Sequence, residues 1–237
     1  MAWGPGAGWQ LDRVPGLLGL HDEPAAFTPP PGLIHELHRR SPGLRMGRTE
    51  RVFEALLPTI LGQKVTVKEA KASYQRLVRR YGEPAPGPVE LRLPPHPEQV
   101  AVLTYADLHP LGVERKRAAT IIEAARRAKR LEAAVTMDAA SADERIQAVR
   151  GIGPWTSAFV RGMALGDPDA IPVGDYHLPH TIAWALARED RATDERMLEL
   201  LEPYRGHRRR VMVLIKGAGI SAPKYGPRTT LRSIERI

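Results

Sequence analysis

A tight turn at residues 151–154, with the sequence Gly-Ile-Gly-Pro, restricts the possible folds of this chain more than any other stretch. Apolar residues at helical spacing lie on both sides of it, which predicts two helices joined by a short hairpin. Proline suits the first position of the second helix. Free backbone N–H groups at such a turn can bind an anion without a charged side chain. Gly-x-Gly alone is a weak signal, however, and it also fits an ordinary corner between packed helices.

The sequence from residue 49 onward is helical in pattern. Apolar residues recur at three- and four-residue spacing, and no segment alternates at period two. Thr66 with Glu69, and Ser141 with Glu144, have the form of capping boxes. The sequence therefore predicts an all-α fold of roughly ten helices. They are expected near residues 9–20, 52–61, 67–81, 114–130, 141–149, 154–165, 176–187, 193–201 and 207–217, with a proline-rich connector at 83–97.

Composition narrows the class of protein. The 35 Lys and Arg residues outnumber the 27 Asp and Glu residues, and the resulting formal net charge of +8 favours a polyanionic partner. The 237 residues include no cysteine, which excludes disulfides, thiol nucleophiles, and cysteine-ligated zinc or iron–sulfur clusters. No apolar run reaches the ~20 residues that span a bilayer, and no signal-peptide pattern follows Met1. We therefore expect a soluble, cytoplasmic protein without a membrane partner, associated with the nucleoid if its source is bacterial.

A carboxylate at Asp175 follows the hairpin after one further helix. An isolated aspartate at such a position usually caps the helix that follows, which is expected to start at Tyr176. A cap position also holds the carboxylate rigidly. The capping role and a chemical role are therefore compatible.

Three separated motifs resemble those of the helix–hairpin–helix (HhH-GPD) DNA glycosylases, and most of all the AlkA-type 3-methyladenine DNA glycosylases. The motifs are Ile-Leu-Gly-Gln-Lys-Val-Thr at 60–66, Val-Arg-Gly-Ile-Gly-Pro-Trp-Thr-Ser-Ala at 149–158, and Gly174-Asp175. They occur in the same order as in that family. The resemblance covers residues 50–217, and more loosely 9–48.

The resemblance implies two helical lobes with the active site in the cleft between them. One lobe is expected at residues 51–166 and carries the hairpin. The other combines residues 1–50 with 167–237 and carries Asp175. Members of the family also have a small N-terminal β-domain, for which this chain is too short. We expect either that the domain is absent or that the chain begins after it.

The resemblance assigns the chemistry to Asp175, which matches the family's catalytic aspartate. Breaking an N-glycosidic bond builds positive charge on the sugar, which a carboxylate stabilises while it orients or deprotonates the attacking water. Trp155 stands where bifunctional members have a lysine that forms a Schiff base, and an indole cannot form one. The resemblance therefore implies a monofunctional hydrolase without AP lyase activity.

Aromatic residues near the hairpin match walls of the family's base pocket. Trp155 and Phe159 lie four residues apart and share one helix face, although most such pairs are simply core packing. Tyr176 is a further expected wall. An aromatic wall attracts the positive charge of an alkylated purine. Some relatives have a tryptophan late in the helix at 207–217, where the nearest match is Val213, and this difference leaves the preferred lesion open.

Several residues are expected to contact DNA. Gln63 and Lys64 match the family segment that fills the gap left by a flipped base, although they also fit exposed loop residues. The hairpin and the basic runs are the other expected contacts, and basic runs are more often solvated faces. The hairpin residues are Gly151, Ile152, Gly153 and Thr156, and the basic residues are Arg205, His207, Arg208, Arg209, Arg210 and the charged face of 114–130, including Arg115, Lys116 and Arg117.

The resemblance also implies a monovalent cation held by backbone carbonyl groups of the hairpin, near Val149 and Ile152. No other cofactor is expected.

These observations favour a monofunctional DNA glycosylase of base excision repair. It is expected to act as a monomer on double-stranded DNA that contains alkylated purines such as 3-methyladenine or 7-methylguanine. Two alternatives remain: a glycosylase for a deaminated or bulky lesion, and a non-catalytic helix–hairpin–helix module that only binds DNA. Asp175 separates enzyme from module, because a binding protein has no need of a carboxylate beside a polyanion.

Overall fold

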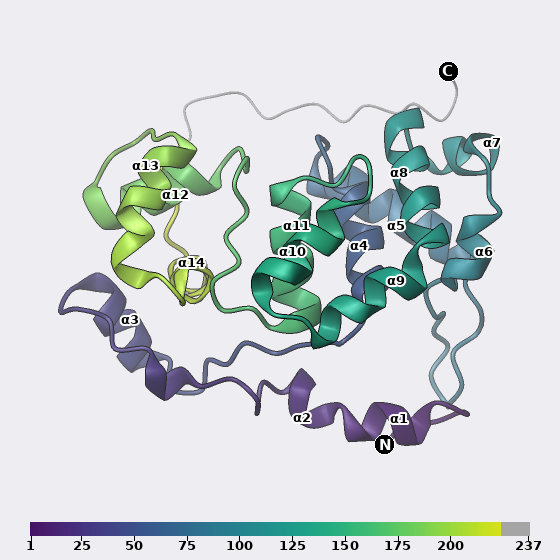
Figure 1. Cartoon of the computed structure of the whole chain (residues 1–237), viewed down its shortest axis with the longest axis horizontal. Coiled ribbons are helices and arrows are strands. Elements are labelled where there is room, and N and C mark those ends of the chain that lie inside the picture. The colour runs from purple at the N-terminus through teal and green to yellow at the C-terminus, as the bar shows by residue number, and fades with distance from the viewer. Residues whose placement is uncertain (224–237) are drawn as a thin grey trace.

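The computed structural model describes residues 1–223, and all regular structure within them is helical (Figure 1). The described residues contain one isolated antiparallel β-bridge, between Pro84 and Arg92 in the proline-rich connector. The prediction of an all-α fold is confirmed. The described residues form fourteen α-helices, more than expected, because several predicted helices are divided. Most of the basic tail 221–237 lies outside the described residues.

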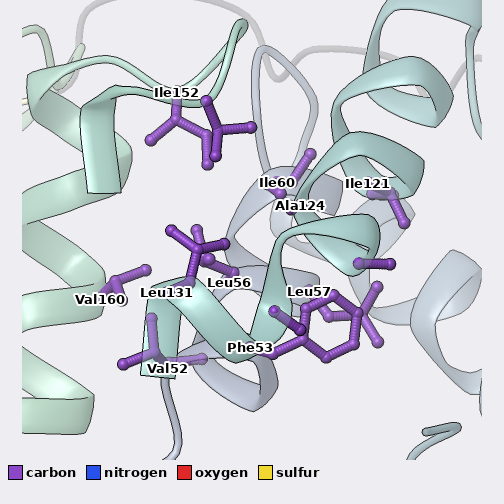
Figure 2. Close-up of a cluster of buried hydrophobic side chains, with 14 of the residues drawn as sticks. Val52, Phe53, Leu56, Leu57, Ile60, Ile121, Ala124, Leu131, Ile152 and Val160 are labelled. Carbon is purple, nitrogen blue, oxygen red and sulfur yellow. The ribbon is translucent and has the colours of Figure 1, made fainter. Parts of the chain in front are cut away.

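The first of two hydrophobic cores is built around α4 (Val52–Leu61) and is shown in Figure 2. Nearly every residue of α4 is buried, as expected for a helix that is apolar on all sides. The Glu132 carboxylate accepts hydrogen bonds from the N–H groups of Val52 and Phe53, at 2.8 and 2.9 Å, and so caps this helix. The helices around α4 are α5 (Val67–Tyr81), α6 (Pro97–Ala101), α7 (Tyr105–Leu108), α8 (Arg115–Arg126), α9 (Ala128–Glu132), α10 (Ala139–Gln147) and α11 (Pro154–Val160).

The second core joins the two ends of the described chain. Phe27 and Ile34, the latter on α3 (Leu33–Arg40), pack with residues of the last three helices. The last three helices are α12 (Leu178–Ala187), α13 (Asp194–Leu201) and α14 (Arg208–Gly217). Figure 1 shows these helices on one side of the molecule and α4–α11 on the other.

The amino-terminal residues run along the α4–α11 side of the molecule (Figure 1). They form α1 (Ala7–Asp12) and α2 (Val14–Leu17), so the helix expected at 9–20 is divided in two. A Cβ atom on Gly87 would lie 3.0 Å from the Trp3 ring, and Arg13 forms an ion pair with Glu50 at 3.1 Å. The buried members of the first core come from residues 52–164 and those of the second from 27–215, and residues 1–26 belong to neither core.

Of the two capping boxes predicted from the sequence, one is present and the other is not. Thr66 and Glu69 form the expected capping box, with Glu69 N–H donating to Thr66 Oγ1 at 3.2 Å. The second predicted box is wrong, because Asp138 caps α10 and accepts from the N–H groups of Ala140 and Ser141. Aspartate is at least as good a cap as serine, so the helix starts earlier.

Two predicted helices are interrupted. The helix expected at 114–130 breaks at Arg127 into α8 and α9, and the one expected at 154–165 changes to a π-helical turn at Arg161–Leu165. The helix expected from Tyr176 begins two residues later, at Leu178. Within residues 1–223, no helix combines the length and the apolar character needed to cross a bilayer.

Candidate active site

The hairpin between α10 and α11 is anchored on one side and open on the other. Ile152 is buried and is one of the side chains of the first core (Figure 2), and its N–H donates to the Val149 carbonyl at 3.0 Å. Gly151 has a φ of +94°, and a Cβ there would overlap Thr120 of α8. A Cβ at Gly153 would meet nothing within 4 Å. Gly151 is therefore required by packing, whereas Gly153 leaves space beside the start of α11.

The segment after α4 is fixed against this hairpin. The side-chain amide of Gln63 donates to the Gly151 carbonyl at 3.0 Å and to Thr156 Oγ1 at 2.9 Å. The buried Arg117 guanidinium donates to the Leu61 carbonyl at 2.8 Å and so satisfies the end of α4. Lys64 is exposed and has a left-handed backbone with φ +56°. The two residues predicted to fill a DNA gap thus differ, since Gln63 is held by the hairpin and Lys64 extends beyond it.

Trp155 connects the hairpin helix to the carboxylate. Its indole packs on Phe159 with ring centroids 4.8 Å apart, and Nε1 donates to Asp175 Oδ2 at 3.0 Å. The structure therefore brings together three residues that sequence analysis placed in one site. Trp155 contacts the carboxylate itself, a role that the pocket-wall prediction did not include.

Asp175 is held from three directions. Oδ1 accepts hydrogen bonds from the N–H groups of His177 and Leu178, both at 2.9 Å, so the capping role at α12 is present. Gly174 has a φ of +88°, and its N–H donates to Asp194 Oδ2 at 2.9 Å. The loop before α12 is thereby fixed to the start of α13, and the carboxylate cannot turn away from Trp155 without breaking the cap.

These contacts keep the carboxylate ionised. Burial alone would raise the pKa of Asp175, but the hydrogen bonds from Trp155, His177 and Leu178 and the charge of Lys216 together lower that pKa below its ordinary value. Each carboxylate oxygen has more than one acceptor site, so Oδ2 can still face a reacting group while it accepts from Trp155. The arrangement can stabilise a developing positive charge or orient a water molecule.

Two predicted site residues lie elsewhere than expected. Tyr176 is 77% exposed and packs edge-on against His177, so it is not the wall of an enclosed pocket. Thr156 is only 2% exposed and its hydroxyl accepts from Gln63. Its contact with Gln63 makes Thr156 a positioning residue, and the contact of Thr156 with DNA stays a prediction.

The basic residues at the start of α14 are occupied by the protein's own carboxylates. Arg208 binds Asp169 through two side-chain hydrogen bonds, one of them at 2.8 Å, and Arg210, fully buried, pairs with Asp22. Arg117 on α8 is 6% exposed. Arg117 and Arg210 are buried and Arg208 is paired with Asp169, so all three side chains are engaged within the protein, and their contact with phosphate stays a prediction.

A cavity of about 410 Å³ lies away from this site. It is bounded by the loop before α4, the turn after the π-helical segment and the start of α14. Its lining includes neither Asp175 nor Trp155, so it is not the predicted inter-lobe cleft. The lining residues include His21, Asp22, Met46, Arg48, Asp167 and His207.

Sequence reasoning missed three supports of the site: Thr120, Arg117 and Asp194. Arg117 was expected to contact phosphate, with a solvated face as the alternative, because its neighbours are charged. Thr193 and Asp194 do have the form of a helix start, and Thr193 does cap α13, but no local pattern shows that Asp194 reaches Gly174. These are contacts between residues distant in sequence.

A family model described as "HhH-GPD superfamily base excision DNA repair protein" matches residues 57–205. This range is more than half of the chain, and it contains Gln63, the hairpin and Asp175. The chain belongs to the HhH-GPD superfamily. The resemblance drawn from the three motifs is thereby confirmed.

A curated relative of this HhH-GPD chain is named "DNA-3-methyladenine glycosylase", from Bacillus subtilis. It is 30% identical over 173 residues, which are 70% of this chain and 57% of the relative. The chain spans between 34% and 57% of the length of the curated relatives it matches. The name agrees with the AlkA-type resemblance.

Solved structures show the same fold. The 3-methyladenine DNA glycosylase from Archaeoglobus fulgidus aligns with a TM-score of 0.67 and 24% identity, over 76% of this chain and 63% of that chain. An 8-oxoguanine glycosylase/lyase from Clostridium acetobutylicum aligns with a TM-score of 0.71 and 15% identity, over 90% and 77% of the two chains. At these identities the likeness establishes the fold and not the substrate.

Proposed function

We propose that the chain is a monofunctional DNA glycosylase that flips out alkylated purines and hydrolyses their N-glycosidic bond in base excision repair. The observation that carries this proposal is the half-buried Asp175 carboxylate, which accepts a hydrogen bond from Trp155 on the hairpin helix. A module that only binds DNA gains nothing from a fixed carboxylate beside a polyanion. The name of the Bacillus subtilis relative supports a 3-methyladenine or 7-methylguanine type of substrate.

The chain's own groups account for the steps. The open side of the hairpin at Gly153 receives a DNA phosphate on backbone N–H groups at the start of α11. Lys64, which is exposed beside it, fills the gap that the flipped nucleotide leaves. The bond from C1′ to the base nitrogen then breaks, and its electron pair leaves with the base. An alkylated cationic purine leaves as a neutral molecule, so no strong general acid is needed.

Asp175 acts on the sugar. Its ionised carboxylate stabilises the oxocarbenium-like state that forms as the base departs. It also orients the water whose oxygen bonds to C1′, while a proton from that water is released. The product is an abasic site. Trp155 offers no amine for a covalent intermediate, which supports hydrolysis without strand cleavage.

The hairpin also fits the monovalent cation that the family resemblance implies. Among residues 1–223, the backbone N–H that the Val149 carbonyl accepts is that of Ile152, and a carbonyl oxygen has two acceptor sites. Oxygen ligands of this kind suit a hard cation. We propose that the carbonyls of Val149 and Ile152 hold such a cation, which would add positive charge near the phosphate.

Release of free base from methylated duplex DNA tests the proposal. The Asp175→Asn variant keeps the shape of the side chain but removes its charge, and we expect its single-turnover rate to fall by at least ~100-fold. Asp12→Asn on the exposed α1 is the matched control and should keep wild-type activity. Equal activity in wild type and Asp175→Asn would remove Asp175 from its role.

A strand-nicking assay tests the absence of lyase activity. Without added base, the enzyme should leave the abasic strand intact, and borohydride should trap no protein–DNA adduct. Efficient β-elimination with a trapped adduct would contradict the monofunctional mechanism.

A further inference from the structure

A second, smaller cavity lies between α9 and the end of α10, where the chain enters the hairpin. Its volume is about 100 Å³. In the part of the chain that the structure describes, the residues that line it are Arg127, Arg130, Leu131, Arg145, Ala148 and Val149. Half of these six residues are arginines and none of them is acidic. Figure 1 shows α9 and α10 as neighbours in this part of the molecule.

The three arginines are not neutralised as Arg208 and Arg210 are. Arg127 pairs with Glu123, but both side chains are partly exposed, and exposed pairs of this kind are weak. Arg145 donates through Nη1 to the Arg130 carbonyl at 3.2 Å, which is an uncharged partner. The Arg130 side chain forms no hydrogen bond or ion pair with the rest of residues 1–223. One carboxylate is therefore set against three guanidinium groups.

The donors of these arginines can be reached from solution. Arg127 and Arg130 are exposed, and Arg145 has no buried nitrogen without a partner. A guanidinium carries five N–H donors in a planar fork, so the contacts above leave most of them unused.

The helix ends explain why three like charges are tolerated here. Arg130 and Arg145 lie in the last turns of α9 and α10, and Arg127 directly follows α8. The negative end of a helix dipole stabilises a positive side chain in that position. The dipoles account for the presence of the arginines, but they do not supply acceptors for the outward donors.

The size of the cavity limits what it can bind. A volume of 100 Å³ equals that of about three water molecules. Pockets for small organic ligands are usually about 300 Å³ or larger. A single phosphate group is small enough, and several N–H donors from arginine are the arrangement that binds such a group well.

The cavity lies beside the hairpin. Val149 lines it, and the Val149 carbonyl accepts the Ile152 N–H at 3.0 Å. A Cβ on Gly151 would overlap Thr120, so α8 runs next to the turn. Thr120 and Arg127 are two helical turns apart on one face, which is roughly 10 Å along the axis. A DNA strand carries a phosphate for each ~3.4 Å of duplex axis, so a strand held at the hairpin has other phosphates within this distance.

We propose that the cavity formed by Arg127, Arg130 and Arg145 binds a backbone phosphate of DNA, a few nucleotides from the phosphate at the hairpin. This inference rests on the proposed function for the position of the DNA strand, and it does not depend on hydrolysis. The hairpin binds its phosphate through backbone N–H groups and the cavity binds the next one through guanidinium groups. Two fixed points determine the direction in which the strand crosses this side of the molecule.

The experiment measures binding to a duplex with one tetrahydrofuran site, a stable analogue of the abasic product that fixes the register of the protein. In each duplex of a series, one backbone phosphate is replaced by an uncharged methylphosphonate. Wild type should lose about tenfold in affinity at two separate positions. Arg130→Met should bind about tenfold more weakly and lose the sensitivity at one of them. Gly153→Ala should lose the sensitivity at the other, which assigns that position to the hairpin.

The matched control is Lys129→Met. Lys129 is exposed on the same helix and does not line the cavity, so this variant loses the same charge outside the site. It should keep both sensitive positions. Arg130→Lys, which keeps the charge but not the planar fork, should keep part of the effect. Folded Arg130→Met and Arg145→Met proteins that both retain the two sensitive positions would overturn the proposal.

Inorganic phosphate tests the other source of the same chemistry. Phosphate that binds wild type and not Arg130→Met, with an unchanged methylphosphonate profile on DNA, would show that the cavity holds a free anion. That result would overturn the assignment to the DNA strand.

Binding to tetrahydrofuran DNA requires no cleavage, so this inference and the proposed function can fail separately. A protein with the expected profiles that releases no base from methylated DNA would overturn the hydrolysis and support the phosphate site. A protein that releases base, but whose profile does not depend on Arg130 or Arg145, would overturn the phosphate site and leave the glycosylase intact.

Discussion

Two helices, α11 and α14, begin in opposite ways. The start of α11 has glycines, free backbone N–H groups and open space at Gly153. The start of α14 has three consecutive arginines, of which Arg208 and Arg210 are paired with carboxylates of the same chain. The uncharged start is therefore the one that is available to an anion from outside. In this protein a run of positive side chains is therefore a poorer guide to an available anion site than backbone donors that no other group occupies.

The helix dipole explains the difference. The positive end of a helix favours an anion and disfavours cations, so an arginine run at the start of α14 is stable only with carboxylates nearby. Asp169 and Asp22 supply them. The start of α11 has no such requirement. We therefore expect changes at α14 to affect folding and changes at the hairpin to affect DNA affinity.

The largest expected effect is on the stability of the α14 side. Asp22→Asn leaves the Arg210 guanidinium buried without a counter-charge, and we expect the free energy of unfolding to fall by about 3–5 kcal/mol. Urea denaturation measures this loss. The double variant Asp22→Asn with Arg210→Met is the control and should recover part of it. A loss below about 1 kcal/mol would mean that the pair is not essential, and the contrast with α11 would then weaken.

The two hairpin glycines should separate folding from binding. Gly153→Ala meets open space, so we expect its unfolding free energy to change by less than about 0.5 kcal/mol while affinity for duplex DNA falls about tenfold. Gly151→Ala meets Thr120 at a positive φ, and should lose about 1–3 kcal/mol of stability. Denaturation and fluorescence anisotropy measure the two quantities. Unchanged DNA affinity in Gly153→Ala would argue against a phosphate at this position.

The smallest expected effect is a shift in pH dependence. Trp155→Phe keeps the contact with Phe159 but removes the hydrogen bond to Asp175, so the pKa of Asp175 should rise. Activity that requires the carboxylate is lost as pH falls through that pKa, and the loss should begin at a higher pH than in wild type. Single-turnover rates from about pH 3 to about pH 8 measure the shift, because the ordinary aspartate pKa is about 3.9 and that of Asp175 is lower. An acid limb at the wild-type position would show that Trp155 does not tune Asp175.

The pH dependence of stability should change in the same direction. Folding lowers the pKa of Asp175, so the ionised carboxylate stabilises the protein above the ordinary carboxyl pKa, and this contribution is lost as pH falls through the lowered value. In the Trp155→Phe variant, the ionised Asp175 carboxylate should contribute less to the free energy of unfolding, because one of its hydrogen bonds is missing.

Local sequence features predicted the hairpin, the Thr66 capping box and the position of Asp175, because each depends on residues a few positions apart. The roles of the arginines could not be predicted in this way. Asp22 lies 188 residues from Arg210, and Asp169 lies 39 residues from Arg208. No local pattern shows that a basic run will be neutralised by the chain itself. Ser141 failed as a cap for a simpler reason, since Asp138 competes for the same helix start.

The second core also has a consequence for biosynthesis. Phe27 and Ile34 pack with residues as late as Ile215, so residues up to at least 215 must leave the ribosome before that core can close. The residues that form the first core end at Leu165, so the α4–α11 side can condense earlier. A nascent chain thus reaches a stage in which the hairpin is folded while the helices that support Asp175 are still unpacked.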